Sequence, residues 1–93
     1  MIKTFKCHEA KGIWEGTVSR RLPMHVQKIA RRKLRMLNNA QILNDLRVPP
    51  GNRLETLKHN RVGQHSIRIN DQWRICFVWN EGDVNDVEIT DYH

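Results

Sequence analysis

Residues 68–93 read RINDQWRICFVWNEGDVNDVEITDYH, and this stretch decides the fold. Apolar and polar side chains alternate on both sides of its NEGD segment, which has the composition of a tight turn. Alternation with a period of two around a short turn is typical of a β-hairpin. The stretch therefore predicts antiparallel strands over 73–79 and 84–92, with the first of them at the centre of a sheet.

The central strand has an apolar face and a polar face, because successive side chains point to opposite sides of a sheet. Its apolar face is formed by Trp73, Ile75, Phe77 and Trp79. The segment QHSIRIN, residues 64–70, predicts a neighbouring strand in which Ile67 and Ile69 share a core face. Arg68 and Arg74 are then placed on the second face, which we expect to be open and cationic.

The clearest helix lies within RRLPMHVQKIARRKLRMLNNA, residues 20–40, where apolar side chains recur at a helical period. Its predicted core face carries Val26, Ile29, Ala30, Leu34 and Leu37. Further elements are expected along the chain: a strand at 1–6, helical turns within 7–16, a short helix at 40–46 and a strand at 53–58. This order predicts one α+β domain over 1–93, with a mainly antiparallel sheet and helices packed on one face.

The charge distribution favours a polyanionic partner. The formal net charge is +6 and the pI is about 9.9. Residues 1–47 hold eleven Lys and Arg against three acids, whereas residues 81–93 hold five acids and no Lys or Arg. A basic surface of this kind suits a nucleic acid or an acidic protein.

Cysteine usage and hydropathy indicate the compartment. Cys7 and Cys76 are far apart and form no CxxC motif, so we expect free thiols in a reducing environment. The first residues lack the apolar segment of a signal peptide, and no apolar run approaches the roughly 18 residues of a membrane span. We therefore expect a cytoplasmic protein without a membrane segment.

Two groups of side chains are candidates for chemistry. Arg68 and Arg74 lie on neighbouring strands, where two guanidinium groups can converge on a phosphate. The alternative is a pair of ordinary arginines on a solvated sheet face. Asp91, Tyr92 and His93 supply a carboxylate, a phenol and an imidazole, and histidine is the usual general acid or base near neutral pH. The alternative for these three residues is a frayed terminus.

The segment 53–61 is basic apart from one acid, Glu55. Its cationic side chains are candidates for a rim that grips a nucleic-acid backbone. The candidates are Arg53, Lys58 and Arg61. A solvated loop is the competing interpretation, because charge runs of this kind are commonly exposed.

The predicted helix over 20–40 also carries a basic stripe, which includes Arg31 and Arg35. This stripe can follow phosphates or meet an acidic protein, and a solvated helix face is the alternative. The five histidines show no metal-ligand spacing, so we expect no metal and no cofactor. The acids of the last strand are the set that Mg²⁺ would use, and they could also offset the charge of the two arginines.

The chain resembles the HigB-type toxins of bacterial toxin–antitoxin pairs, within the RelE-like superfamily. The resemblance spans nearly the whole length. It is strongest over PPGNRLETLKHNRVGQHSIRINDQWRICFVW, residues 49–79, and over the ending VEITDYH, residues 87–93. These segments are especially similar to the GraT branch. The resemblance implies a small curved antiparallel sheet flanked by helices, cleavage of mRNA in the decoding site of the ribosome, and a HigA-like helix-turn-helix antitoxin as partner.

The resemblance also implies roles for residues that match by position. The family's catalytic group falls on Asp91, Tyr92 and His93. Arg68 and Arg74 take the place of phosphate-binding residues, with Lys58 beside them. The chain departs from some relatives at Glu55, where they carry an active-site histidine, and at His65, where they carry an aromatic residue.

The function that we expect is metal-independent RNA cleavage, in which the 2′-OH of the substrate attacks the adjacent phosphorus. His93 would act as acid or base, with Asp91 or Glu55 as its counterpart, while Arg68 and Arg74 stabilise the developing charge. Two other functions fit the same composition. One is a non-catalytic translation inhibitor that occupies RNA or the ribosome, and the other is a metal-dependent nuclease.

Overall fold

The computed structural model describes residues 1–91, apart from the side chain of His59. The described chain forms an antiparallel sheet in the order β1-β2-β3-β4. The strands are β1 (Glu55–Thr56), β2 (Gln64–Arg68), β3 (Trp73–Asn80) and β4 (Asp83–Asp91). The helices are α1 (His8–Trp14), α2 (Met24–Asn39) and the short 3-10 helices η1 (Leu43–Arg47), η2 (Pro50–Asn52) and η3 (His59–Arg61). This architecture confirms the predicted α+β class.

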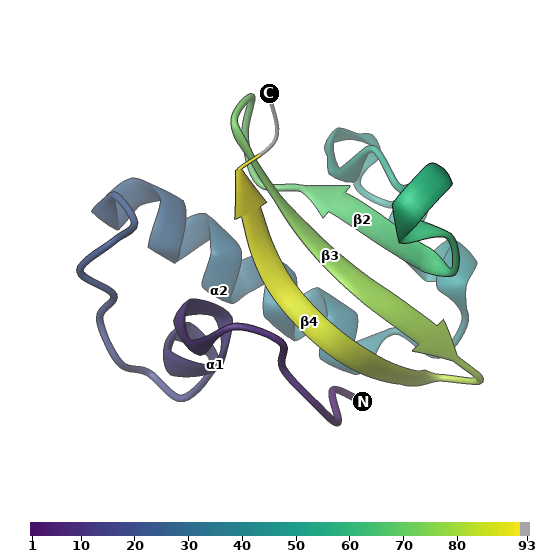
Figure 1. Ribbon diagram of the computed structural model, residues 1–93, viewed down its shortest axis with the longest axis horizontal. Helices are drawn as coiled ribbons and strands as arrows, with labels where there is room; N and C mark the ends of the chain where they lie inside the picture. Colours follow the sequence, from purple (N-terminus) through teal and green to yellow (C-terminus); the bar gives the residue numbers. More distant parts are fainter. Residues whose placement is uncertain (92–93) are drawn as a thin grey trace.

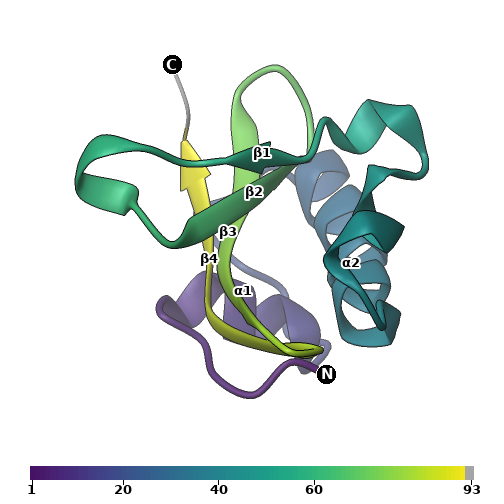
Figure 2. The ribbon, with the colours of Figure 1, turned by 90° about the vertical axis from the view of Figure 1, so that its right-hand side faces the viewer.

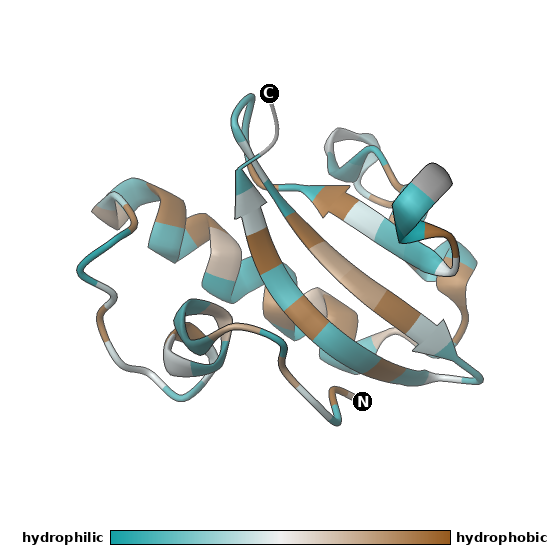
Figure 3. Ribbon diagram, viewed as in Figure 1, coloured by the Kyte–Doolittle hydropathy of each residue, from teal (hydrophilic) through white to brown (hydrophobic). Residues whose placement is uncertain are grey.

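The hydrophobic core lies between one face of the sheet and the two α-helices. α2 passes behind β3 and β4, and α1 lies beside β4 (Figure 1). The sheet contributes the buried side chains Ile67, Ile75, Phe77, Val84 and Val87. Along β4, apolar and polar residues appear as alternating bands (Figure 3). Four predicted core residues of α2 are confirmed, because Ala30, Leu34 and Leu37 are 0% exposed and Val26 is 1% exposed, whereas the fifth, Ile29, is only partly buried against the core.

The ends of both α-helices follow from local sequence. α2 begins after its N-cap residue Pro23, whose ψ of 146° is extended, so the proline stands one position before the first helical turn. It ends at Asn39 because Ala40 is extended, with ψ of 133°. After α1, Gly16 adopts φ of 91°, a left-handed conformation that glycine accepts without strain. These positions agree with the predicted helix limits.

The first predicted strand, at 1–6, is only partly formed. It contacts β4 through two isolated parallel bridges, at Ile2 and Phe5. Between the bridged positions of β4, Asp86 adopts φ of 51° and the β3–β4 register shifts, which is the geometry of a β-bulge. The bulge interrupts the ladder, so the segment 1–6 does not pair continuously.

Two other predicted elements also differ from the structure. The predicted helix at 40–46 is replaced by η1, because a side-chain oxygen of Asp45 accepts the N–H groups of Gln41 and Ile42 and closes a local turn. The predicted strand at 53–58 is reduced to the two residues of β1. Arg53 has φ of 44°, a left-handed conformation that no strand accommodates.

The second face of the sheet is covered where we predicted an open face. Buried side chains that project there are Ser66, Arg74 and Cys76. The segment from β1 to η3 extends across the sheet (Figure 2). Leu57 in this segment is buried, and the Arg61 guanidinium reaches Glu88 of β4 at 2.7 Å. Periodicity within the strands could not predict this cover, because it depends on a connection elsewhere in the chain. Within residues 1–91, no helix has the length and apolar character needed to cross a membrane.

Candidate active site

The second face of the sheet carries a polar hollow of about 360 Å³, which we call the arginine pocket. Its lining residues are Arg53, Glu55, Arg68, Asn70, Asp71 and Arg74. Arg68 and Arg74 are direct partners in the β2–β3 ladder, so both side chains leave the same face. Arg53 and Glu55 come from the segment that leads into β1, and Asn70 and Asp71 come from the β2–β3 turn. The structure therefore brings together the two arginines that the spacing paired.

Arg74 is the most firmly held residue of the pocket. Its side chain is only 9% exposed. Its Nε donates to Ser66 Oγ at 2.8 Å, and its Nη2 donates to the Arg53 carbonyl at 2.6 Å and to the Ser66 carbonyl at 3.3 Å. The same Nη2 lies 3.4 Å from Glu55 Oε2. Hydrogen bonds to a planar guanidinium fix its orientation, so the pocket presents a preorganised cation.

Arg68 is more exposed than Arg74 and pairs with a carboxylate nearby in sequence. Its Nη2 pairs with Asp71 in the β2–β3 turn. The side chain of Arg68 is 31% exposed and that of Asp71 is 97% exposed. An ion pair between exposed groups is worth about 0–1 kcal/mol. An incoming anion can therefore replace the Asp71 carboxylate at Arg68.

The acids found beside the two arginines are Glu55 and Asp71. We expected acids of the last strand in this role. Glu88 of β4 is instead paired with Arg61, while Asp86 is exposed in the β-bulge. The acids that offset the pocket therefore come from β1 and from the turn before β3.

The C-terminal end of β4 lies beside the β2–β3 turn (Figure 1). Asp91 pairs with Trp73 in the ladder, and its Oδ2 accepts a hydrogen bond from Gln72 Nε2 at 3.1 Å. Arg74 pairs with Thr90, and paired residues share a face, so Asp91 projects to the opposite face from Arg74. Asp91 is not among the residues that line the arginine pocket. Two predicted catalytic residues lie outside the described residues, Tyr92 and His93.

The three predicted rim residues have different surroundings. Arg53 lines the arginine pocket, and its carbonyl accepts the hydrogen bond from Arg74. Lys58 is exposed in the loop between β1 and η3 and does not line the pocket. Arg61 is half-buried and bound to Glu88, so it forms part of the cover over the second face. Arg53 is thus the one of the three that lines the pocket.

The two predicted contacts on α2 also differ. The Nε of Arg31 donates to the Ile13 carbonyl of α1 at 3.3 Å, so Arg31 links the two helices. Arg35 is exposed on the surface of α2. Arg35 is therefore better placed than Arg31 for contact with a polyanion.

Burial shifts the pKa of two side chains in the sheet. It lowers the pKa of His65, whose Nδ1 lies 3.1 Å from Thr56 Oγ1. It raises the pKa of the Cys76 thiol, which keeps that group protonated and unreactive at neutral pH. Among the described residues, no three His, Cys, Asp or Glu side chains are grouped as metal ligands would be.

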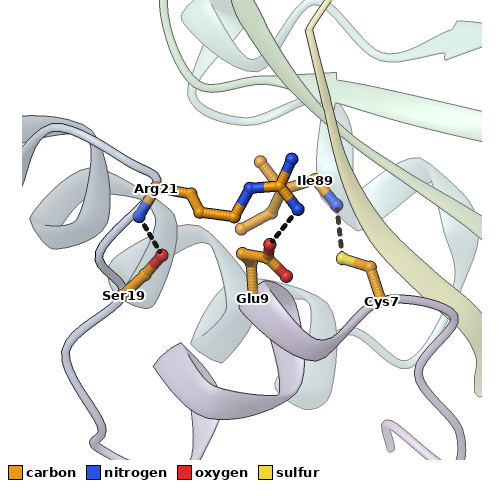
Figure 4. Close-up of polar contacts among 5 residues, drawn as sticks. All are labelled: Cys7, Glu9, Ser19, Arg21 and Ile89. Carbon is orange, nitrogen blue, oxygen red and sulfur yellow. Dashed lines mark hydrogen bonds and ion pairs between the residues drawn. The ribbon is translucent and has the colours of Figure 1, made fainter.

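A second hollow, of about 320 Å³, lies on the helix side of β4. It is lined by Cys7, Glu9, Arg21, Leu22, Trp73 and Ile89. Figure 4 shows Arg21 extended over Glu9, with its Nη1 at 3.1 Å from Glu9 Oε1, and the Ile89 N–H directed at Cys7 Sγ. This hollow has one cation against the three of the arginine pocket. The arginine pocket is therefore the better candidate active site.

Sequence reasoning missed three residues that shape the arginine pocket. Ser66 shares a face with Arg68 by simple alternation, so this signal was available. Asn70 Oδ1 accepts the N–H groups of Gln72 and Trp73 at 2.9 and 2.8 Å, which shapes the β2–β3 turn. An Asn-Asp pair between two strands is a known turn signal, but it does not predict that Asp71 folds back onto Arg68.

The chemistry that this arrangement supports is binding and stabilisation of a phosphodiester. Three cationic side chains and one amide surround a hollow that a phosphate group can enter. Arg74 is fixed, and Arg68 can exchange its carboxylate for an anion. Glu55, with a side chain that is 52% exposed, offers a carboxylate at the same place.

Comparison with solved structures defines the class of fold. The YoeB-YefM toxin–antitoxin complex from Staphylococcus aureus contains a chain that matches with a TM-score of 0.63 at 17% identity, covering 100% of this chain and 98% of that one. YafQ from E. coli strain BL21(DE3) matches with a TM-score of 0.61 at 13% identity, covering 98% and 91%. The fold is therefore that of the RelE/YoeB-like proteins.

Sequence comparison defines the family within that class. The model described as RelE-like toxin of type II toxin-antitoxin system HigB matches residues 3–93. Toxin HigB-1 of Vibrio cholerae is 46% identical over 63 residues, covering 68% of this chain and 66% of the relative, a little under two thirds. A Haemophilus influenzae protein is 35% identical over 72 residues, covering 77% of this chain and 71% of the relative. The chain belongs to the HigB family of RelE-like type II toxins.

Proposed function

We propose that this protein is a ribosome-dependent mRNA endoribonuclease that inhibits translation as the toxin of a type II pair, in the GraT-like branch of the family. The observation that carries the proposal is the arginine pocket, in which two arginines from adjacent strands and the carboxylate of Glu55 surround one hollow. Membership of the HigB family supports the same activity. An enzyme that acts on translating ribosomes works in the cytoplasm.

Cleavage proceeds by transesterification. The 2′-OH of the substrate attacks the adjacent phosphorus, the bond to the 5′-oxygen breaks, and the products carry a 2′,3′-cyclic phosphate and a 5′-OH. Arg74 and Arg68 bind the non-bridging oxygens, where negative charge grows in the transition state. Removing one such preorganised donor costs about 10²–10³ in rate in well-studied enzymes.

Proton transfer needs one group to accept the 2′-OH proton and another to protonate the leaving 5′-oxygen. We assign the first role to Glu55, because it is the carboxylate that lines the pocket beside Arg74. We assign the second role to His93, with Tyr92 as a further donor. Asp91 projects to the other face of β4, so its place is to orient its neighbours and not to contact the phosphate. Each acid–base group is worth about 10²–10⁴ in rate.

The ribosome supplies what the small pocket lacks, namely alignment of the mRNA backbone for in-line attack. Positioning of this kind lowers the activation barrier by several kcal/mol in favourable cases. Arg53, Lys58 and Arg35 contact RNA phosphates. Arg61 and Arg31 stabilise the surrounding fold through their contacts with Glu88 and with the Ile13 carbonyl. The second partner is a HigA-like helix-turn-helix antitoxin, which neutralises the toxin.

The test is an mRNA-mapping assay with purified protein. Equal amounts of mRNA are incubated alone or on programmed ribosomes, and new 5′ ends are mapped by primer extension. We expect cleavage on ribosomes and little cleavage of free mRNA, with both Glu55→Gln and Arg68→Gln slowing it. Arg47→Gln, a change at an exposed residue outside the pocket, is the control. Stalled translation with intact mRNA would establish the alternative, a non-catalytic inhibitor that occupies RNA or the ribosome.

A further inference from the structure

Lys33 of α2 is buried, although lysine is among the residues least often found in protein interiors. It is 6% exposed, while Lys28 and Arg35 on the same helix are exposed. Its ammonium donates a hydrogen bond to Asn52 Oδ1 in η2, and Asn52 is 0% exposed. A buried charge costs free energy even when it is hydrogen-bonded, so this contact needs a reason.

The contact leads directly toward the arginine pocket. Asn52 Nδ2 donates to the Leu46 carbonyl at 3.1 Å and to the Val48 carbonyl at 3.3 Å, which fixes the connection between η1 and η2. The next residue is Arg53, which takes the left-handed conformation and turns its carbonyl to Arg74 Nη2 at 2.6 Å. The hydrogen bond from Lys33 to Asn52 and the hydrogen bond from Arg74 to the Arg53 carbonyl are thus linked by the peptide bond between Asn52 and Arg53, and together they join α2 to a guanidinium of the pocket.

The positive charge of Lys33 also interacts with that of Arg68 in the pocket. Burial lowers the pKa of Lys33, and the positive charges of Arg32 and Arg68 lower it further. Arg68 lines the pocket, so the buried ammonium stands within electrostatic reach of the site from the helix side.

We propose that Lys33 is a positioning residue for the RNA-cleavage reaction. Acting through Asn52, it fixes the turn at Arg53 and so the orientation of the Arg74 guanidinium. Lys33 does not contact the substrate. Its effect on catalysis rests on the proposed function, whereas its effect on Arg74 can be measured without any substrate.

Two substitutions at Lys33 separate the hydrogen bond from simple packing. Lys33→Met keeps an unbranched side chain of similar length and removes the donor to Asn52. Lys33→Gln removes the charge and keeps a donor. Lys28→Met, at an exposed position of the same helix, is the matched control for loss of one positive charge.

The first readout is the side-chain NMR spectrum of protein labelled with ¹⁵N-arginine. The Nε–H of Arg74 donates to Ser66 Oγ in a buried site, so it should give a separate, slowly exchanging resonance. We expect this resonance to shift and broaden in Lys33→Met, to remain close to its wild-type position in Lys33→Gln, and to be unchanged in Lys28→Met. A folded Lys33→Met protein with an unchanged Arg74 resonance would overturn the proposal. If Lys33→Met does not fold, an unchanged Arg74 resonance in a folded Lys33→Leu protein, which also lacks the donor to Asn52, overturns the proposal instead.

The second readout is single-turnover cleavage of mRNA on programmed ribosomes. We expect Lys33→Met to lower the rate constant about 10–100-fold, the size of effect that a small misplacement of a catalytic group produces. The apparent affinity for ribosomes should change little, and the protein should stay folded at the assay temperature, although the melting temperature falls because Asn52 Oδ1 loses its donor. A merely structural lysine predicts the opposite pattern, in which the rate falls only as the folded fraction falls. Absence of cleavage by the wild-type protein would refute the proposed function, and the NMR result would still decide the role of Lys33.

Discussion

Arg68 and Arg74 stand directly opposite each other in the β2–β3 ladder, and each faces a carboxylate of the same chain. Like charges in directly opposed positions destabilise a sheet. Asp71 offsets the charge at Arg68, and Glu55 offsets it at Arg74. The free protein therefore holds both arginines in a neutralised form, and under the proposed function RNA would exchange at least the Asp71 carboxylate for a phosphate.

Arg74→Lys should lose most of the catalytic activity. Lysine keeps the charge but cannot make the same hydrogen bonds to Ser66 and Arg53, so the cation is no longer fixed. We expect single-turnover cleavage on ribosomes to fall about 10²–10³-fold. Urea unfolding should show a loss of about 1–3 kcal/mol, because buried acceptors lose their partner. Activity within threefold of wild type would show that the fixed guanidinium is not needed.

Asp71→Asn should raise the affinity for RNA that is not bound to ribosomes. The change frees Arg68 from its carboxylate and removes a negative charge beside the incoming phosphate. We expect the Kd for a short single-stranded RNA to fall about twofold to fivefold at low salt, because an exposed pair contributes about 0–1 kcal/mol. Asp86→Asn changes the net charge by the same amount at an exposed position away from the pocket, and it should have a smaller effect. Equal effects of the two substitutions would mean that overall charge alone controls binding.

The elements that could be predicted from sequence are those whose side chains repeat within one element. β3, β4 and α2 each show their period directly, and their core residues follow from it. The bulge at Asp86 and the reduction of β1 to two residues could not be predicted in this way. They depend on pairing with residues 1–6 and on the left-handed turn at Arg53, and neither leaves a periodic signal.

His65 should make the stability of the protein depend on pH in the acidic range. Its pKa in the folded state lies below the ordinary value of about 6.5 because the ring is partly buried. Above about pH 6.5 the ring is neutral in both states, and its full contribution to the free energy of unfolding is present. As the pH falls through the lowered pKa, the unfolded state binds a proton more readily than the folded state, so that contribution is lost. We expect the free energy of unfolding of wild type to fall relative to that of His65→Phe below about pH 6.5. Parallel curves for the two proteins from pH 5 to pH 8 would contradict this assignment.

Arg31 and Arg35 should differ in their contributions although they lie on the same helix. Arg35→Gln removes an exposed cation, so the slope of log affinity against log salt for RNA should fall by about one. Arg31→Gln breaks the hydrogen bond to Ile13 and should instead lower the free energy of unfolding by about 0.5–1.5 kcal/mol. Each variant serves as the control for the other. A large change in salt slope for Arg31→Gln with unchanged stability would reverse these roles.

The candidate site was predictable only in part. Alternation placed Arg68 and Arg74 on one face, and the structure places both in one hollow. The acids that offset them were predicted in the last strand, because a local reading cannot show that Asp71 folds back or that Glu55 comes beside Arg74. Lys33 left a signal, since it falls between Ala30 and Leu37 on the apolar side of α2, but a lysine in a basic stretch is easily assigned to the solvent face.

The central claim is that the 2′-OH of the mRNA is the attacking group and that the arginine pocket stabilises the reaction without a metal. The most direct measurement replaces the nucleotide at the cleavage site, once mapped, by its 2′-deoxy analogue in mRNA on programmed ribosomes. We expect the deoxy substrate to remain intact, while the ribose substrate gives 2′,3′-cyclic phosphate and 5′-OH ends. Cleavage of both substrates at similar rates, with 3′-OH and 5′-phosphate ends, would contradict the claim and indicate hydrolysis by a metal-dependent nuclease.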